Sequence, residues 1–337
     1  ERETARRADE LAPAIIAALA KPYPMISSIR IGASMGIYRS DRPQLTEMLL
    51  RADFALYGAK RRGRNEFRFF DAELERELER RQCIERDLQA AIEAGNLCTW
   101  FQPIVRLDSG AVVGFEALLR WRHAVHGAIS PPEIVDAARE TGLLQLLTEA
   151  VFANGCAMIE GLTKQGRRDV RVAMNLSPRE LEAANIDDMI LDGLKARRLP
   201  ATMLEIEITE EAPVDRDRVD EKLGRLSHAG ISIALDDFGT GFSTLASLKD
   251  GRIRKVKIDK GFIRGLAKSP EDQLLVRSVI DLGRSLGIEI MAEGVETEAD
   301  RAILQALGCK IAQGYLFSKA LPLHEALGLK AEEPAVR

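Results

Sequence analysis

The sequence lacks the features of a membrane-spanning or exported chain. No run approaches the roughly 20 apolar residues that a transmembrane helix needs, and the first four residues do not resemble a signal peptide. With 46% hydrophobic and 30% charged residues, the composition is that of a soluble globular protein. We therefore expect a cytoplasmic chain that makes no membrane contact itself, which leaves open membrane or sensor segments upstream in a longer protein.

Paired cysteines and an excess of positive charge are also missing. The four cysteines form no Cys-x-x-Cys pair, which argues against a disulfide framework or a cysteine zinc site and favours reduced, mostly buried thiols: Cys83, Cys98, Cys156 and Cys309. The formal net charge of −4 argues against binding to polymeric nucleic acid, although a local basic pocket for phosphates remains compatible with it. The 337 residues suffice for one domain of about 250 residues and a smaller neighbour.

The first part of the chain alternates helical and strand patterns. Helices are predicted over residues 5–20 and 45–60, and strands over 29–37 and 66–70. This αβαβ piece carries no cluster of chemically active residues, and its opening helix indicates that the chain begins partway through a domain. A charged helix over 71–95, ended by Gly95 and Asn96, then predicts a linker. The expected organisation is a partial domain (1–71), a helical linker (72–95), a large domain (96–330) and a tail (331–337).

The large domain shows eight strand patterns with helical stretches between most of them. The strands are expected to begin near Trp100, Val112, Val170, Met203, Ile231, Lys255, Ile288 and Lys310. This alternation predicts an α/β fold, a TIM-type (β/α)8 barrel. Only residues 108–110 separate the first two strands, which is too short for a parallel crossover, so this pair is predicted to be antiparallel.

Polar residues stand where these apolar strands end, and the carboxyl ends of barrel strands converge on one mouth. Oxygen ligands of this kind suit Mg²⁺ or Mn²⁺, and the candidates are Glu116, Asn175, Glu207, Asp236, Asp237 and Glu293. Lys257 and Gln313 follow the sixth and eighth strand patterns in the same way. Two cations roughly 3.5–4 Å apart neutralise a phosphodiester and convert water to hydroxide, so the set points to phosphodiester chemistry.

Each residue alone also has a structural interpretation. Glu116 and Arg120 share a strand face and could form an ion pair in the barrel wall. Asn175 could be a turn residue, Asp236 and Asp237 could cap a helix, and Glu205 is best explained as a solvated acid on a half-exposed strand. Lys257 could be a structural partner of an acid, and Gln313 could cap a loop. None of the four histidines is expected at a strand end, which argues against a histidine base.

Across about residues 96–323, the chain resembles the EAL-domain cyclic di-GMP phosphodiesterases. Several segments carry the resemblance in order: Gln102-Pro103-Ile104-Val105, Glu116-Ala117-Leu118-Leu119-Arg120-Trp121, Asn175-Leu176-Ser177, Glu207-Ile208-Thr209-Glu210, Asp236 to Gly241, Lys257-Ile258-Asp259, Ala292 to Thr297, and Gln313-Gly314-Tyr315. The family members hydrolyse cyclic di-GMP with two ions of Mg²⁺ or Mn²⁺, and the resemblance implies the same cofactors and substrate here.

The resemblance also implies residue roles. One metal would be bound by Glu116, Asn175, Glu207 and Asp236, with Asp236 bridging to a second metal that Asp237 and Glu293 also hold. Lys257 would help to position the attacking water, and Gln313 would lie beside it. Substrate contacts would come from Gln102, Leu118 and Arg120, and Glu210 would anchor the loop from Asp236 to Ser243, which tends to shape a homodimer interface through the barrel.

The preceding part resembles the C-terminal part of a GGDEF domain, through Ala52 to Lys60 and Gly63-Arg64-Asn65, but the GGDEF signature itself is absent. We therefore predict no cyclase activity. Departures from the usual EAL pattern include Arg139, where an acid is common, and Phe242, where tyrosine is common, and neither removes a proposed metal ligand.

The sequence thus predicts a metal-dependent phosphodiesterase that opens cyclic di-GMP to linear pGpG through a metal-activated water. Two alternatives remain at this point. One is a catalytically silent cyclic di-GMP receptor, although the ligand set is complete, and the other is a structural barrel that mediates dimers, which leaves the clustered acids unexplained.

Overall fold

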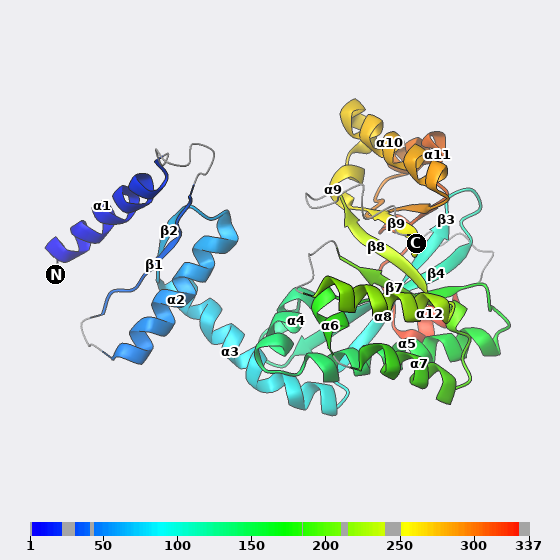
Figure 1. Ribbon diagram of the computed structural model, residues 1–337, viewed down its shortest axis with the longest axis horizontal. Coiled ribbons are helices and arrows are strands. Elements are labelled where there is room, and N and C mark those ends of the chain that lie inside the picture. The colour runs from blue at the N-terminus through cyan, green and yellow to red at the C-terminus, as the bar shows by residue number, and fades with distance from the viewer. Residues whose placement is uncertain are drawn as a thin grey trace. The chain divides into compact units, whose positions relative to one another are not determined.

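The computed structural model describes residues 2–21, 31–40, 44–183, 185–209, 215–239 and 251–329 (Figure 1). The chain divides into two compact units, Glu1–Asp87 and Leu88–Arg337, and each is considered by itself. Within the described ranges, no helix combines the length and the apolar character needed to cross a bilayer.

The first unit has the predicted αβαβ order: α1 (Arg2–Leu19), β1 (Met35–Ile37), α2 (Leu45–Arg62) and β2 (Phe67–Phe69). The two strands pair in parallel, Met35 opposite Phe67. A strand is predicted over residues 29–37, but among its described residues only Met35–Ile37 form β1. Residues 31–34 have no strand partner, because β2 has only three residues. Gly36 lies directly on α2: a Cβ there would lie 1.9 Å from the carbonyl oxygen of Ala52.

The charged segment forms one helix, α3 (Ala72–Glu93). Leu74, Ile84 and Leu88 are buried along it at spacings of ten and four residues, so they share one helix face. The helix ends before Gly95, whose φ of 68° is a left-handed conformation that glycine adopts without steric cost.

Eight strands of the second unit close into a barrel in the order β3-β11-β10-β9-β8-β7-β6-β4, with β4 returning to β3. As predicted, β3 runs antiparallel to β4, and it is also antiparallel to β11. The remaining neighbours are parallel. The bounds are β3 (Leu97–Arg106), β4 (Val112–His123), β6 (Arg171–Asn175), β7 (Leu204–Ile208), β8 (Ser232–Phe238), β9 (Ile253–Ile258), β10 (Glu289–Ala292) and β11 (Ile311–Ala312).

A ninth strand, β5 (Gly127–Ile129), was not predicted. It pairs antiparallel with the end of β4, from Trp121 opposite Ile129 to His123 opposite Gly127. Three residues are too few to show an alternating pattern, so the sequence alone does not distinguish this strand from a loop.

Helices follow the strands and cover the outside of the barrel, and α10 and α11 lie side by side there (Figure 1). They are α4 (Pro131–Glu140), α5 (Leu144–Lys164), α6 (Pro178–Glu182), α7 (Ile186–Ala196), α8 (Arg216–His228), α9 (Lys260–Ile263), α10 (Pro270–Leu286), α11 (Glu298–Leu307) and α12 (Leu323–Gly328), with short 3₁₀ turns at Ala201–Met203 and Leu266–Lys268.

The two faces of the strands differ in chemistry. Outward-facing residues such as Phe115, Val172 and Ile206 are fully buried in one large apolar cluster with the helices. Inside the barrel, only a small apolar cluster of Ile104, Met291 and Ile311 is present among the described residues. Alternation along each strand therefore places polar side chains inside, and those nearest the carboxyl ends of the parallel strands form the site described next.

Candidate active site

Lys257 of β9 lies at the centre of the inward-facing acids. Its side chain is 1% exposed, and its Nζ lies 2.7 Å from Glu293, 2.8 Å from Glu207, 3.1 Å from Asp236 and 3.6 Å from Glu116. These acids come from four different strands or strand ends, so barrel closure brings them together. Its neighbours on β9, Val256 and Ile258, are buried as well, so the ammonium of Lys257 is desolvated.

Two amides hold the carboxylate of Glu116. Asn175, at the end of β6, donates its Nδ2 hydrogen to Glu116 Oε1 at 2.9 Å, and Gln313, just after β11, donates to Oε2 at 2.7 Å. Gln102 stands directly opposite Glu116 across the β3–β4 pair. The predicted residues Glu116, Asn175 and Gln313 are thus in contact, and neither amide merely caps a turn.

Asp236, Asp237 and Glu293 form the part of the site that best fits a cation. Their carboxylate oxygens all lie within 4.8 Å of one another. Asp237 has a φ of 53°, an uncommon conformation for a residue with a side chain, and its backbone N–H donates to Asp236 Oδ1 at 3.0 Å. The strained backbone at the end of β8 therefore keeps both adjacent acids at this mouth.

The donor set fits hard divalent cations. In the neighbouring group, Glu207 Oε1 is buried without a hydrogen-bond partner in the described structure, and such an oxygen needs a donor or a cation. Carboxylate and amide oxygens are the ligands that Mg²⁺ and Mn²⁺ prefer. The residues available to hold such ions are Glu116, Asn175, Glu207, Asp236, Asp237 and Glu293.

The electrostatics reflect several acids sharing one ammonium. Burial raises the pKa of Glu293 to about 7, with Asp236 adding to the rise and Lys257 opposing it. Burial also raises the pKa of Glu207 well above its usual range, despite Lys257. For Glu116, burial acts to raise the pKa, but Lys257 and the bonds from Gln313 and Asn175 outweigh it and the pKa is lowered.

Burial lowers the pKa of Lys257, but its four acidic neighbours have the larger combined effect and raise this pKa well above the usual value. Lys257 is therefore a permanent cation in this site. The pKa of Asp237 is raised by burial first and then by Asp236 and Asp259. The mouth therefore holds more acidic groups than the single ammonium of Lys257 can neutralise. A divalent cation would neutralise the remaining negative charge.

A cavity of about 280 Å³ opens beside these acids. Gln102, Glu116 and Leu118 line one side of it, and Gln102 donates to the carbonyl oxygen of Ser318 at 3.1 Å. Arg120 does not form the wall ion pair with Glu116 that was considered from the sequence: its Nη1 donates to the carbonyl oxygen of Leu119 at 2.7 Å.

The sequence analysis assigns no site role to three further residues that line this cavity, Lys260, Arg264 and Tyr315. Each follows a barrel strand by a few residues, and that position was the available signal. Arg264 Nη2 lies 2.6 Å from Glu296, just before α11, which begins at Glu298 with Thr297 as its N-cap.

The prediction that Glu205 is a solvated acid is wrong. Glu205 is fully buried, and its Oε1 accepts a hydrogen bond from Lys255 Nζ at 2.5 Å. The barrel closes over both, since Glu205 and Lys255 lie one inward-facing position before Glu207 and Lys257 on the same two strands. The described interior of the barrel thus contains two stacked ion pairs. The pair of Lys257 and Glu207 lies at the mouth, and the pair of Lys255 and Glu205 lies one layer deeper.

Two other expectations are also corrected. His123 is the last residue of β4, so a histidine does stand at a strand end, but its Nδ1 accepts the N–H groups of Val125 and His126 at 3.2 Å and holds the β4–β5 turn. The cysteines are not mostly buried: Cys156 and Cys309 are, whereas Cys83 is partly exposed and Cys98 is exposed.

Some predicted residues lie outside the described part of the chain. Glu210, the proposed loop anchor, is one of them, as is Phe242 in the loop that follows β8. Arg139 is described and forms an ion pair with Asp136 at 3.0 Å on α4.

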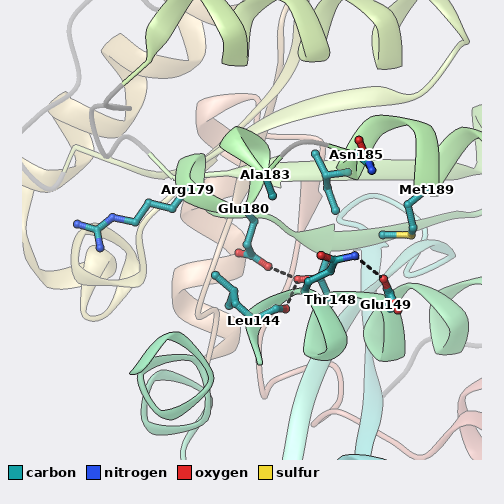
Figure 2. A pocket seen from close by; sticks show the side chains of 10 residues that line it. Leu144, Thr148, Glu149, Arg179, Glu180, Ala183, Asn185 and Met189 are labelled. Atoms are coloured by element: carbon teal, nitrogen blue, oxygen red, sulfur yellow. Dashed lines mark hydrogen bonds between the residues drawn. The ribbon is translucent and has the colours of Figure 1, made fainter. Parts of the chain in front are cut away.

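A second, smaller cavity of about 80 Å³ lies among α5, α6 and α7. Thr148 donates to Glu180 at 2.6 Å there, and Figure 2 shows Arg179 extending away from both. Glu180 is itself held in the capping box of α6 with Ser177. These polar groups serve helix capping and packing, so the catalytic candidate remains the barrel mouth.

The chain belongs to the EAL domain family, whose model matches residues 85–320. It is 36% identical over 321 residues to the bifunctional diguanylate cyclase/cyclic di-GMP phosphodiesterase MucR of Pseudomonas aeruginosa, covering 94% of this chain and 47% of that protein. It is 34% identical over 300 residues to the cyclic di-GMP phosphodiesterase NbdA of the same species, covering 89% of this chain and 38% of NbdA.

A solved structure of the PaMucR phosphodiesterase in complex with c-di-GMP superposes with a TM-score of 0.68 at 37% identity, covering 72% of this chain and 99% of that one. The predicted family and TIM-type barrel are therefore confirmed. The chain spans less than half the length of these two curated relatives.

Proposed function

We propose that this chain hydrolyses cyclic di-GMP to linear pGpG with the help of two divalent cations, Mg²⁺ or Mn²⁺. In this reaction, water adds across one phosphodiester P–O bond, so one ester becomes a terminal phosphate and a free hydroxyl. The support is homology to cyclic di-GMP phosphodiesterases together with the chemistry of the barrel mouth.

The observation that carries the proposal is the set of six oxygen-bearing side chains at the barrel mouth, four of which surround one buried lysine. A receptor that only binds a phosphodiester anion would gain affinity from positive charge, whereas this mouth presents an excess of carboxylates. An anionic substrate approaches such a surface only when cations lie between. The complete ligand set therefore favours the enzyme over the silent receptor.

The chain's own residues then have distinct tasks. Six of them would hold the cations: Glu116, Asn175, Glu207, Asp236, Asp237 and Glu293. When bound, two such cations neutralise phosphate charge and lower the pKa of water. Lys257 stabilises the acids and would position the attacking water, while Glu293, whose pKa is raised to about 7 by burial, would lose its proton when it holds a cation.

Gln313 and Asn175 fix the orientation of Glu116, as their hydrogen bonds indicate. Substrate binding falls to Gln102, Leu118 and Arg120 on the β3–β4 wall. Glu210 keeps its proposed role as the anchor of the loop after β8.

The decisive experiment is chromatographic analysis of cyclic di-GMP incubated with the chain in Mg²⁺ or Mn²⁺, beside two variants. Glu116→Ala should lose at least about 100-fold in kcat, because it removes a cation ligand. Glu289→Ala is the matched control, since Glu289 is exposed at the opposite end of a barrel strand and should leave turnover within about twofold.

Appearance of pGpG from the parent and from Glu289→Ala, but not from Glu116→Ala, would support the proposal. Tight binding of cyclic di-GMP with no product from the parent would contradict it and favour the receptor. Neither binding nor hydrolysis would favour a structural barrel.

Two further parts of the proposal concern the rest of the chain. We propose that the unit before the barrel is the C-terminal part of a GGDEF-like domain, which is consistent with the 94% coverage of this chain by its match to MucR. We also propose a homodimer through the barrel, which light scattering of the purified chain would test directly.

A further inference from the structure

Trp100 is a large exposed aromatic residue of β3, two residues before Gln102, which lines the active-site cavity. Its side chain is 37% exposed, although it belongs to β3, whose next five residues are all buried. In the β3–β4 pair, Trp100 stands opposite Leu118, and Gln102 stands opposite Glu116. Residues directly opposite one another share a sheet face, so Trp100 faces the same interior as Glu116.

The other tryptophan behaves differently. Trp121 is 4% exposed and lies one residue beyond Arg120, on the other face of β4. Its ring makes an edge-to-face contact with His123 at 5.2 Å between centroids. Burial and packing thus account for Trp121, whereas they do not account for the exposed indole of Trp100.

The indole of Trp100 is positioned by a cation–π contact with Arg120. Arg120 places its Cζ 5.9 Å from the centroid of the Trp100 ring, within the range of a cation–π contact. The hydrogen bond from Arg120 to the Leu119 carbonyl oxygen at 2.7 Å fixes the guanidinium in turn. A fixed aromatic ring loses little conformational freedom when a second flat ring packs on it, which favours binding.

The distance between Trp100 and the level of the cation ligands is compatible with the distance between base and phosphate in a nucleotide. Trp100 and Gln102 are one inward-facing step apart on β3, which corresponds to about 7 Å. Phosphates must lie at the level of Glu116 and Asp236, where the cation ligands are. A base joined to such a phosphate through its ribose lies farther out along the wall, at the level of Leu118 and Trp100.

We propose that Trp100 is the stacking platform for one guanine base of the substrate, and that Arg120 orients its ring. The inference rests on the proposed function and adds a binding residue to it. Stacking of a base on an aromatic side chain contributes enough affinity that Trp100→Ala should weaken binding of cyclic di-GMP about 5- to 150-fold. Trp100→Phe keeps an aromatic face and should stay within about threefold of the parent.

The test uses the fact that the chain has two tryptophans. Cyclic di-GMP is titrated into the parent, Trp100→Phe, Trp100→Ala and Trp121→Phe, with Ca²⁺ in place of Mg²⁺ or Mn²⁺. Calorimetry measures the affinity, and tryptophan emission is measured in parallel. A guanine stacked on indole quenches its emission. Quenching should therefore occur in the parent and in Trp121→Phe, and it should disappear in Trp100→Phe even though that variant still binds.

The outcomes separate the inference from the function on which it rests. Loss of quenching in Trp100→Phe with retained affinity, together with weakened binding by Trp100→Ala, would support the platform. Persistent quenching in Trp100→Phe, or parent-like affinity in Trp100→Ala, would overturn it while leaving the proposed function intact. Absence of cyclic di-GMP binding by the parent would overturn both.

Discussion

At the scale of single residues, Lys257 determines whether the acidic mouth is stable without metal. One ammonium lies within 3.6 Å of four carboxylates, and burial makes each uncompensated charge costly. The side chain of Lys257 is thus a structural counter-ion as well as a candidate for positioning water. The two roles can be separated by measuring stability and activity independently.

We expect Lys257→Met to lower the free energy of unfolding of the metal-free protein by about 3–5 kcal/mol, because it leaves buried acids without a partner. Urea denaturation measures the change, and added Mg²⁺ should restore part of it. Lys260→Met is the control, since Lys260 is exposed and forms no part of this ion-pair group. Equal urea midpoints for Lys257→Met and the parent would contradict the prediction.

A second residue-scale prediction concerns Glu293. Its pKa is raised to about 7, chiefly by burial, so below pH 7 it is mostly protonated and must lose the proton to bind a cation. Metal affinity should therefore increase as the pH rises through 7. Calorimetry of Mn²⁺ binding in buffers of different ionisation enthalpy should detect protons released at pH 6.5, and fewer for Glu293→Gln.

Binding of Mn²⁺ at pH 6.5 without proton release would show that the acid is already ionised. Release that is unchanged in Glu293→Gln would assign the proton to another group, of which Glu207 is the first candidate because its pKa is also raised.

At the scale of elements, the segment after β11 is the most tightly constrained part of the mouth. Gly314 follows Gln313, and a Cβ at Gly314 would lie 2.1 Å from the carbonyl oxygen of Val295 and 2.3 Å from its nitrogen. Backbone atoms cannot yield as a flexible side chain does. Only glycine lets the β11 segment and the loop after β10 approach so closely, and that approach positions Gln313.

Gly314→Ala should therefore lower kcat by more than about tenfold through displacement of Gln313, with a loss of stability of about 1–3 kcal/mol. The matched control is Gly155→Ala in the middle of α5, where a Cβ would meet nothing within 4 Å. Alanine favours helix there, so this control should be neutral or more stable by about 0.5–1 kcal/mol. Kinetics and thermal unfolding of both variants test the contrast.

Element types were predictable where patterns were long and connections short. The three residues 108–110 correctly predicted the antiparallel start of the barrel, and apolar runs correctly predicted all eight barrel strands. The three-residue strand β5 carries no such pattern. Glu205 was misassigned because an alternating acid has the same pattern on a solvated sheet as inside a barrel, where Lys255, fifty residues later, pairs with it.

The proximity of the candidate site residues was predictable because strand ends of a barrel converge, so sequence position alone indicates which residues lie together. The interactions within the site were not predictable. That Lys257 would contact four acids, or that Glu116 would be held by two amides, depends on the strand stagger and side-chain rotamers of the closed barrel. Trp100 was not singled out, since an aromatic residue in a strand is most often core.

At the scale of the whole molecule, removal of metal should abolish activity without unfolding the chain. Lys257 already compensates part of the acidic charge, so the far-UV circular dichroism spectrum should stay unchanged in EDTA. Mg²⁺ at about 100 times its Kd should stabilise the fold by about 2.7 kcal/mol, which raises Tm by several degrees. Collapse of the spectrum in EDTA would instead indicate a barrel that depends on metal to fold.

The reversed direction of β3 has a consequence for how the barrel is joined to what precedes it. In a regular parallel barrel, the polypeptide enters the first strand at the end remote from catalysis. Here α3 ends at Glu93 and β3 begins at Leu97, which pairs with Trp121 near the carboxyl end of β4. The chain therefore passes from α3 into the barrel at the rim that carries the candidate site, three residues before Trp100 and five before Gln102.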